Sequence, residues 1–228
     1  MLYTLEAVRG NIRNRDGKRV FFLGRGDQLT SEARDYLTRE RIEIRPADTA
    51  KITEYHLLSG GVLREKPEHM THLNGDVLVP KTHPRIAFRG AMDTLEAELL
   101  LCQLEVPEMA RHLGEILDLA RHLVGWEVME EPVKLERLCG LTEAEQRSRS
   151  HNPQQYYGQP HFMPGVADGA AVLRLNRCRC AARAAELAAA AAFTDGDGRL
   201  LREDLLRALN RMSSMLYILM IQTKKKEK

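Results

Sequence analysis

The sequence predicts a mainly α protein, a five-helix bundle that follows a small N-terminal α/β appendage. Two observations lead to this fold class. Beyond residue 84, long segments repeat apolar residues at helical spacing and are separated by proline or glycine. The first 70 residues instead hold two short apolar runs on either side of a helical segment. We therefore expect two regions in the 228-residue chain, residues 1–70 and residues 71–228.

The N-terminal region is expected to contain a β-α-β unit. Val20–Leu23 is an apolar run between polar and glycine residues, which is typical of a strand. Thr30 can cap a helix over residues 31–40, and residues 42–44 alternate as a second strand should. Residues 47–80 are rich in histidine, glycine and proline, so we expect them to be a linker and an active-site loop.

The rest of the chain is expected to be mostly helical. Apolar residues recur every three or four positions in four long segments, residues 86–105, 107–128, 170–192 and 200–222. Pro132–Leu138 is predicted to be a short helix that ends at Gly140. Thr142 and Glu145 have the spacing of a capping box for another short helix. Several prolines and glycines predict a loop over residues 152–169.

Composition and termini exclude several functional classes. A formal net charge of +2 gives no electrostatic case for a nucleic-acid partner. Four cysteines without a CxxC pair predict reduced thiols, as in a cytoplasmic protein. The N-terminus lacks a basic start followed by an apolar core, so no signal peptide is expected. The longest apolar run near the C-terminus, residues 215–221, is too short to cross a membrane.

A polar stripe stands out on the alanine-rich segment 170–192. Arg179, Arg183 and Glu186 are spaced four and three residues apart, so they share one face of a helix. The stripe could be a solvated face with an internal ion pair. It could also be a phosphate site, because arginine offers forked donors that match phosphate oxygens. Spacing alone leaves both interpretations open.

Four stretches occur in a defined order along the helical region. They are Lys81–Ile86 with Phe88–Asp93, Phe162–Gly165, Arg179–Glu186 and Leu209–Ser214. In this order and spacing the chain resembles the PduO-type corrinoid adenosyltransferases, and most closely their ethanolamine-utilisation branch, EutT. The resemblance extends over residues 71–221. Each motif alone is weak, but four in order within one helical bundle are specific.

The resemblance implies a cobalamin adenosyltransferase-like five-helix bundle that assembles into homotrimers, with active sites between subunits. It implies transfer of the 5′-deoxyadenosyl group of ATP to the cobalt of reduced cobalamin, cob(I)alamin, with release of triphosphate. Mg²⁺ bridging the phosphates is expected from this chemistry. A cobalt reductase would act before the enzyme, and an adenosylcobalamin-dependent ammonia-lyase would receive its product. The expected setting is ethanolamine utilisation in the cytoplasm, with possible association to a bacterial microcompartment.

The resemblance also assigns roles to individual residues. Those that match ATP-binding positions are Lys81, Arg183, Glu186 and Asn210. Arg179 matches an arginine that pairs across the subunit interface with an aspartate, and Asp93 matches that aspartate. Together with Arg183, these two are the expected catalytic residues. Arg183 and Lys81 would neutralise the charge of the departing triphosphate.

The corrinoid is expected to meet the segment around Phe162 and Met163, together with Phe88. Apolar side chains beneath the cobalt would exclude a lower-axial ligand. The alternative, in which this segment only plugs its own small core, is equally compatible with the sequence.

The chain departs from the family pattern in two places. The segment that matches the phosphate loop, Thr71–Asp76, keeps only a Gly-Asp remnant. Many EutT proteins also carry a histidine followed by a Cys-Cys-x-x-Cys cluster, which is absent between His56 and Pro84. His56, His69 and His72 remain, but without thiolates we expect no structural metal. The reduced phosphate loop keeps a second interpretation open, a corrinoid-binding or delivery protein of a microcompartment without efficient catalysis.

Overall fold

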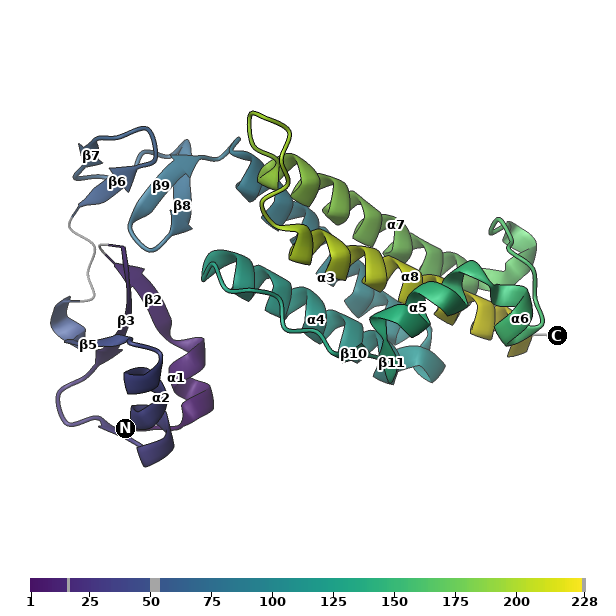
Figure 1. Ribbon diagram of the computed structural model, residues 1–228, viewed down its shortest axis with the longest axis horizontal. Coiled ribbons are helices and arrows are strands. Elements are labelled where there is room, and N and C mark those ends of the chain that lie inside the picture. The colour runs from purple at the N-terminus through teal and green to yellow at the C-terminus, as the bar shows by residue number, and fades with distance from the viewer. Residues whose placement is uncertain (16, 50–53, 227–228) are drawn as a thin grey trace. The chain divides into compact units, whose positions relative to one another are not determined.

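The computed structural model describes residues 1–15, 17–49 and 54–226 and divides into two compact units, Met1–Lys81 and Thr82–Lys228. The division lies after Lys81 and not after residue 70 as expected. The reason is that the strands β8 (Met70–Asn74) and β9 (Val77–Pro80) pair within the N-terminal unit. Figure 1 labels helices and strands of both units.

The N-terminal unit contains the expected β-α-β arrangement. Strand β3 (Lys18–Leu23) pairs in parallel with β5 (Glu43–Pro46), and α2 (Ser31–Arg39) connects them. Thr30 caps α2 by accepting the Ala33 backbone N–H at 3.3 Å, which confirms the predicted cap. Further elements at the start of the chain are β1 (Leu2–Tyr3), α1 (Leu5–Gly10), β2 (Ile12–Arg15), β4 (Gln28–Leu29) and the short 3₁₀ turn Ala47–Thr49.

The interpretation of residues 47–80 as an irregular linker is wrong for the described part of that range. Strands β6 (Tyr55–Leu57), β7 (Val62–Leu63), β8 and β9 form a sheet in the order β7-β6-β9-β8. The segment matched to a phosphate loop lies in the β8–β9 hairpin, whose turn holds Gly75 at φ +53°. Leu73, Leu78 and Val79 are buried by the sheet, which is why this short segment folds.

The second unit is predominantly helical. Four long helices of 19 to 25 residues lie alongside one another in Figure 1: α3 (Pro84–Glu105), α4 (Ala110–Val128), α7 (Gly169–Phe193) and α8 (Glu203–Lys226). Helix α7 packs against α3 and α8, and α3 packs against α4. A 3₁₀ turn, Pro107–Met109, links α3 to α4. Shorter helices α5 (Glu143–His151) and α6 (Pro153–Tyr157) follow α4, and α5 packs on α8.

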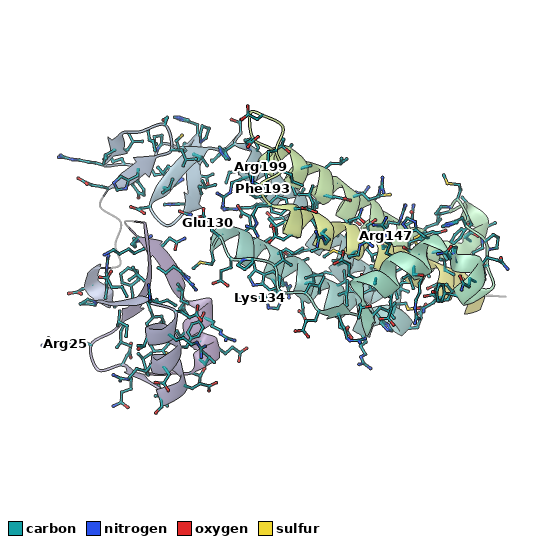
Figure 2. The ribbon with its side chains drawn as sticks, in the orientation of Figure 1. Arg25, Glu130, Lys134, Arg147, Phe193 and Arg199 are labelled. Atoms are coloured by element: carbon teal, nitrogen blue, oxygen red, sulfur yellow. The ribbon has the colours of Figure 1, made fainter. Side chains whose placement is uncertain are left out.

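The core of this unit follows the predicted periodicity. The buried residues of α3 recur every three or four positions: Phe88, Met92, Leu95, Leu99 and Cys102. The alanines of α7 supply its buried face, because small side chains allow two helices to approach closely on either side. Phe193, labelled in Figure 2 at the end of α7, meets Phe88 edge to face with ring centroids 5.8 Å apart.

The predicted helix over Pro132–Leu138 is wrong. This segment has no regular structure before Arg137 and ends in a hairpin of β10 (Arg137–Leu138) and β11 (Leu141–Thr142). Its backbone is held by α8, since Val133 N–H donates to the Asp204 carboxylate at 2.9 Å. The predicted capping box is confirmed, because Thr142 and Glu145 exchange both capping hydrogen bonds at the start of α5.

Residues 152–169 are less irregular than predicted, since they contain α6 and a 3₁₀ turn at Val166–Asp168. Gly158 ends α6 with a left-handed φ of +70°. Among the described helices, none is both long enough and apolar enough to span a bilayer.

Candidate active site

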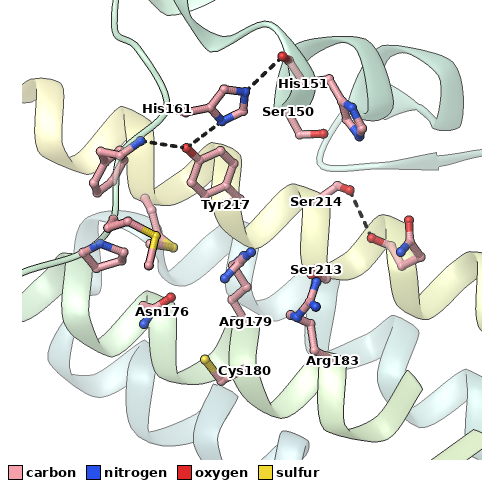
Figure 3. A pocket seen from close by; sticks show the side chains of 15 residues that line it. Ser150, His151, His161, Asn176, Arg179, Cys180, Arg183, Ser213, Ser214 and Tyr217 are labelled. Carbon is pink, nitrogen blue, oxygen red and sulfur yellow. Dashed lines mark hydrogen bonds between the residues drawn. The ribbon is translucent and has the colours of Figure 1, made fainter. Parts of the chain in front are cut away.

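A cavity of about 710 Å³ lies in the helical unit, bordered by α7, α8, the end of α5 and the segment after α6 (Figure 3). Its volume falls in the range of cavities that hold one ligand of drug or nucleotide size. The lining residues are Ser150, His151, His161, Phe162, Met163, Pro164, Asn176, Arg179, Cys180, Arg183, Asn210, Ser213, Ser214, Tyr217 and Met220. None of these described lining residues is acidic.

Helix α7 gives the cavity its positive charge. Arg179 and Arg183 lie one turn apart on α7, and both extend from that helix toward the cavity in Figure 3. The Arg179 guanidinium stands over the Tyr217 ring at 5.5 Å. Within the part of the chain that the structure describes, neither guanidinium group pairs with a carboxylate. Both groups are therefore available to an anion.

Helix α8 supplies the opposite wall through Asn210, Ser213, Ser214 and Tyr217, which recur at helical spacing. Asn210 Nδ2 donates to Glu186 Oε1 of α7 at 3.0 Å. Arg211 donates through Nη2 to Asn210 Oδ1. Both ends of the Asn210 amide are thus occupied, and its orientation beside the cavity is fixed.

Arg211 itself lies behind this wall and is only 6% exposed. Burial lowers the pKa of its guanidinium, although Glu143 and Glu186 act in the opposite direction. Two further donors of this side chain, Nε and Nη1, are buried and have no hydrogen-bond partner among the described residues. Asn210 therefore stabilises a buried charge as well as a cavity wall.

The apolar side of the cavity is formed by the segment after α6. The Phe162 ring stacks on Tyr217 with centroids 6.0 Å apart and is partly buried against the core. Met163 lines the cavity and remains 90% exposed, as a methionine that contacts a ligand or partner would. One cavity thus combines a cationic wall with an apolar one.

Four residues assigned by resemblance are not among the lining residues. Glu186 is one of them and reaches the cavity wall only through its hydrogen bond with Asn210. Phe88 is fully buried in the core beside Phe193 and is not among the lining residues, so it contacts no ligand there. Lys81 belongs to the N-terminal unit, where its ammonium group pairs with Glu68 at 2.7 Å. Asp93 is exposed on α3 and pairs with no basic residue in the described chain.

Several lining residues had no individual role predicted from the sequence: Ser150, His151, His161, Pro164, Asn176, Cys180, Ser213, Ser214, Tyr217 and Met220. A signal for some of them existed in the sequence. Asn176 and Cys180 share the helical face of Arg179 and Arg183, and Ser213, Ser214 and Tyr217 share that of Asn210. Ser150 and His151 carry no such signal, because only the tertiary fold brings the end of α5 to the cavity.

The described residues contain no group of three or more histidine, cysteine, aspartate and glutamate side chains that could hold a metal. Two of the three N-terminal histidines have other partners. His56 Nδ1 lies 2.9 Å from Asp76 Oδ2, and His72 Nδ1 lies 3.0 Å from the Gly75 carbonyl oxygen. The expectation of no structural metal remains a prediction.

Comparison with known proteins agrees with this geometry. A family model described as cobalamin adenosyltransferase matches residues 62–223, beginning before the resemblance drawn from the sequence alone. The proteins named corrinoid adenosyltransferase EutT from Salmonella typhimurium and Escherichia coli K12 are similar to this chain, at 34% and 32% identity over 158 residues. Each alignment covers 69% of this chain but only 59% of the relative, so the chain spans less than two thirds of their length. The family match spans most of the chain and includes both walls of the cavity, and the chain belongs to the cobalamin adenosyltransferase family.

Proposed function

We propose that this protein is an ATP:cob(I)alamin adenosyltransferase that serves ethanolamine utilisation. The cobalt of the reduced corrinoid attacks C5′ of ATP, the C5′–O5′ bond breaks, and triphosphate leaves with the bonding electrons. The observation that carries this proposal is Arg183, which has no carboxylate partner among the described residues and lies beside Arg179 in a cavity that also has an apolar side at Phe162 and Met163. The similarity to proteins named corrinoid adenosyltransferase EutT supports it.

The cationic wall suits the leaving group. Negative charge grows on the triphosphate as the C5′–O5′ bond breaks, and fixed positive groups at that place stabilise the transition state more than the bound substrate. We assign this role to Arg183. Glu186 orients Asn210 through their 3.0 Å hydrogen bond, so that the Asn210 wall is ready to meet ATP.

The lining residues are compatible with a Mg²⁺ ion that is held mainly by the phosphates of the substrate. The lining residues offer hydroxyl and amide oxygens but no carboxylate, and Mg²⁺ in phosphate sites is held largely by phosphate oxygens and water. When bound, the ion would neutralise part of the triphosphate charge. The Ser214 hydroxyl on the α8 wall donates to the Asn210 backbone carbonyl oxygen, so its own oxygen could still accept or bind such an ion.

The assembly is proposed to be a homotrimer with active sites between subunits. A cavity of about 710 Å³ suits one nucleotide but does not enclose a corrinoid as well. Arg179 and Asp93 each lack a partner of opposite charge in the described chain, which fits a pair formed across an interface. In such an arrangement α3, α4, α5, α7 and α8 would be the five helices of the bundle. Phe162 and Met163 would face the corrinoid.

The partners follow from the reaction. A reductase has to supply cobalt in the reduced state, and an adenosylcobalamin-dependent ammonia-lyase would receive the product. The cytoplasm, with possible association to a microcompartment, is the proposed location.

The test is direct. The full chain is mixed with ATP, Mg²⁺ and chemically reduced cobalamin, and both adenosylcobalamin and triphosphate are measured. Formation of the two products in equal amounts supports the proposal. Tight corrinoid binding without turnover would contradict it and favour the delivery protein instead.

A further inference from the structure

The segment from His161 to Asp168 is held onto α8 by two side chains, and this arrangement defines the apolar side of the cavity. Within this segment only the 3₁₀ turn Val166–Asp168 is regular structure, so its position depends on contacts with other elements. Tyr217 and Lys224 of α8 provide those contacts. They lie seven residues, and therefore about two turns, apart on one helix face.

Tyr217 holds the start of the segment through its hydroxyl group. That oxygen accepts the Phe162 backbone N–H at 3.3 Å and lies 3.1 Å from His161 Nδ1. His161 Nε2 lies 3.0 Å from the His151 carbonyl oxygen, which can only accept, so Nε2 carries the hydrogen. In the neutral imidazole Nδ1 is then the acceptor, and the Tyr217 hydroxyl donates to it. All three groups are satisfied at once, as Figure 3 shows.

Lys224 holds the middle and the end of the same segment. Its Nζ lies 4.0 Å from the centre of the Phe162 ring and 2.6 Å from Asp168 Oδ1. Both side chains of this ion pair are mostly buried, with 22% and 13% exposure, so solvent screens it less than a surface pair. The other oxygen of Asp168 accepts the Gly165 N–H at 2.8 Å and closes the segment on itself.

We propose that Tyr217 and Lys224 are positioning residues that set the place of Phe162 and Met163 for the corrinoid. This proposal rests on the proposed function. Phe162 is held by three contacts, with the Tyr217 hydroxyl, the Tyr217 ring and the Lys224 ammonium group. The next residue, Met163, is thereby presented to the cavity with 90% of its surface free. Arg179 stacks on the same Tyr217 ring, so one side chain connects the cationic wall with the apolar wall.

The test removes one oxygen atom and leaves the ring. Tyr217→Phe keeps the stacking with Phe162 and Arg179 but loses the hydrogen bonds to the segment. We expect KM for cob(I)alamin to rise about three- to tenfold, the effect of one lost hydrogen bond, with KM for ATP within about twofold of the parent value. Lys224→Met should shift KM for cob(I)alamin in the same direction.

The matched control is Tyr156→Phe. Tyr156 also forms a hydroxyl hydrogen bond, at 2.9 Å from Ser148 Oγ, but it does not line the cavity. This variant loses the same atom in the same unit, and its KM values should be those of the parent chain. If Tyr156→Phe raised KM for cob(I)alamin as much as Tyr217→Phe does, the effect would come from a general loss of order in the helical unit. That result would overturn the proposal.

A second readout is independent of catalysis. Hydrogen exchange at the Phe162 amide in the ligand-free full chain should accelerate about three- to tenfold in Tyr217→Phe and stay unchanged in Tyr156→Phe. Unchanged exchange and an unchanged corrinoid KM in Tyr217→Phe would overturn the proposal while leaving the enzyme active. Absence of turnover in the parent chain would instead contradict the proposed function, and the exchange experiment would still test how the segment is held.

Discussion

Asn210 of α8 donates its side-chain amide to Glu186 of α7 at 3.0 Å, and this hydrogen bond joins the two helices at the edge of the candidate active site. The same amide accepts from Arg211, whose guanidinium group is buried. Asn210 therefore contributes both to the candidate active site and to the stability of the core. A change at Asn210 has to affect both the fixed cavity wall and the buried charge behind it.

We expect Asn210→Ala to lower the free energy of unfolding by about 1.5–3 kcal/mol, because Arg211 loses its acceptor while it remains buried. Chemical denaturation of the variant and parent chains measures this. The control is Ser213→Ala, which shortens the same wall without touching the bond between Asn210 and Glu186. An Asn210→Ala protein as stable as the parent would show that Arg211 has a sufficient partner elsewhere.

A second prediction concerns Glu127, which is fully buried and binds both Arg85 and Arg89. Glu127→Gln removes the charge that Glu127 supplies to two mostly buried guanidinium groups and should destabilise the fold by about 3–5 kcal/mol. Glu130→Gln is the control, since Glu130 pairs with Arg85 at 3.5 Å but its side chain is 63% exposed. That change should alter stability by less than about 1 kcal/mol. If Glu127→Gln and Glu130→Gln lowered the thermal stability equally, Glu127 would not be the main counter-charge of these arginines.

The thiols offer a chemical probe of the cavity. Cys180 is exposed and lines it, whereas Cys139 is half-buried, and burial together with Glu115 raises the pKa of its thiol to about 12. At pH 8 iodoacetamide should therefore modify Cys180 first, and saturating Mg²⁺-ATP should slow that reaction. Peptide mass mapping over time records both effects. If saturating Mg²⁺-ATP did not slow the modification of Cys180, the nucleotide would not bind in this cavity.

How far the sequence predicts the structure can be judged from particular residues. Helical periodicity alone places Arg179 and Arg183 on one face, so the sequence predicts the polar stripe without knowledge of the fold. The same periodicity places Phe88 on an apolar face but cannot say whether that face meets a ligand or the core, where it lies. Tyr217 and His161 are 56 positions apart, so only the packed helices reveal their contact.

The N-terminal errors have a similar cause. Asn74 and Gly75 form a turn pair of the kind that predicts a hairpin, yet the density of breaking residues around them suggested a loop. Lys81 matches a phosphate-binding position by sequence, but an ion pair with Glu68 engages its ammonium group. Pro132–Leu138 lacks the helix because α8 offers its backbone a hydrogen bond through Asp204.

The assembly prediction rests on Asp93 and Arg179. The parent chain should sediment as a trimer at micromolar concentration, and Asp93→Arg should weaken it by placing two like charges at the interface. The double variant Asp93→Arg with Arg179→Asp should recover the trimer, although not the activity. A stable monomer of the parent chain would contradict the proposed intersubunit sites.

The central claim is that the stripe on α7 faces the triphosphate of ATP, and the rate of adenosylcobalamin formation by Arg183 variants tests it most directly. Arg183→Ala should slow the reaction about ten- to a hundredfold, the effect of losing one charge-assisted contact of roughly 1.5–3 kcal/mol. Arg183→Lys should be impaired less, because it keeps the charge and loses the forked geometry. Arg199→Ala, at an exposed turn in the same unit, should match the parent chain. All melting temperatures should be unchanged, since Arg183 is exposed. An Arg183→Ala protein with the parent rate and the parent melting temperature would place this arginine on a solvated face and contradict the account.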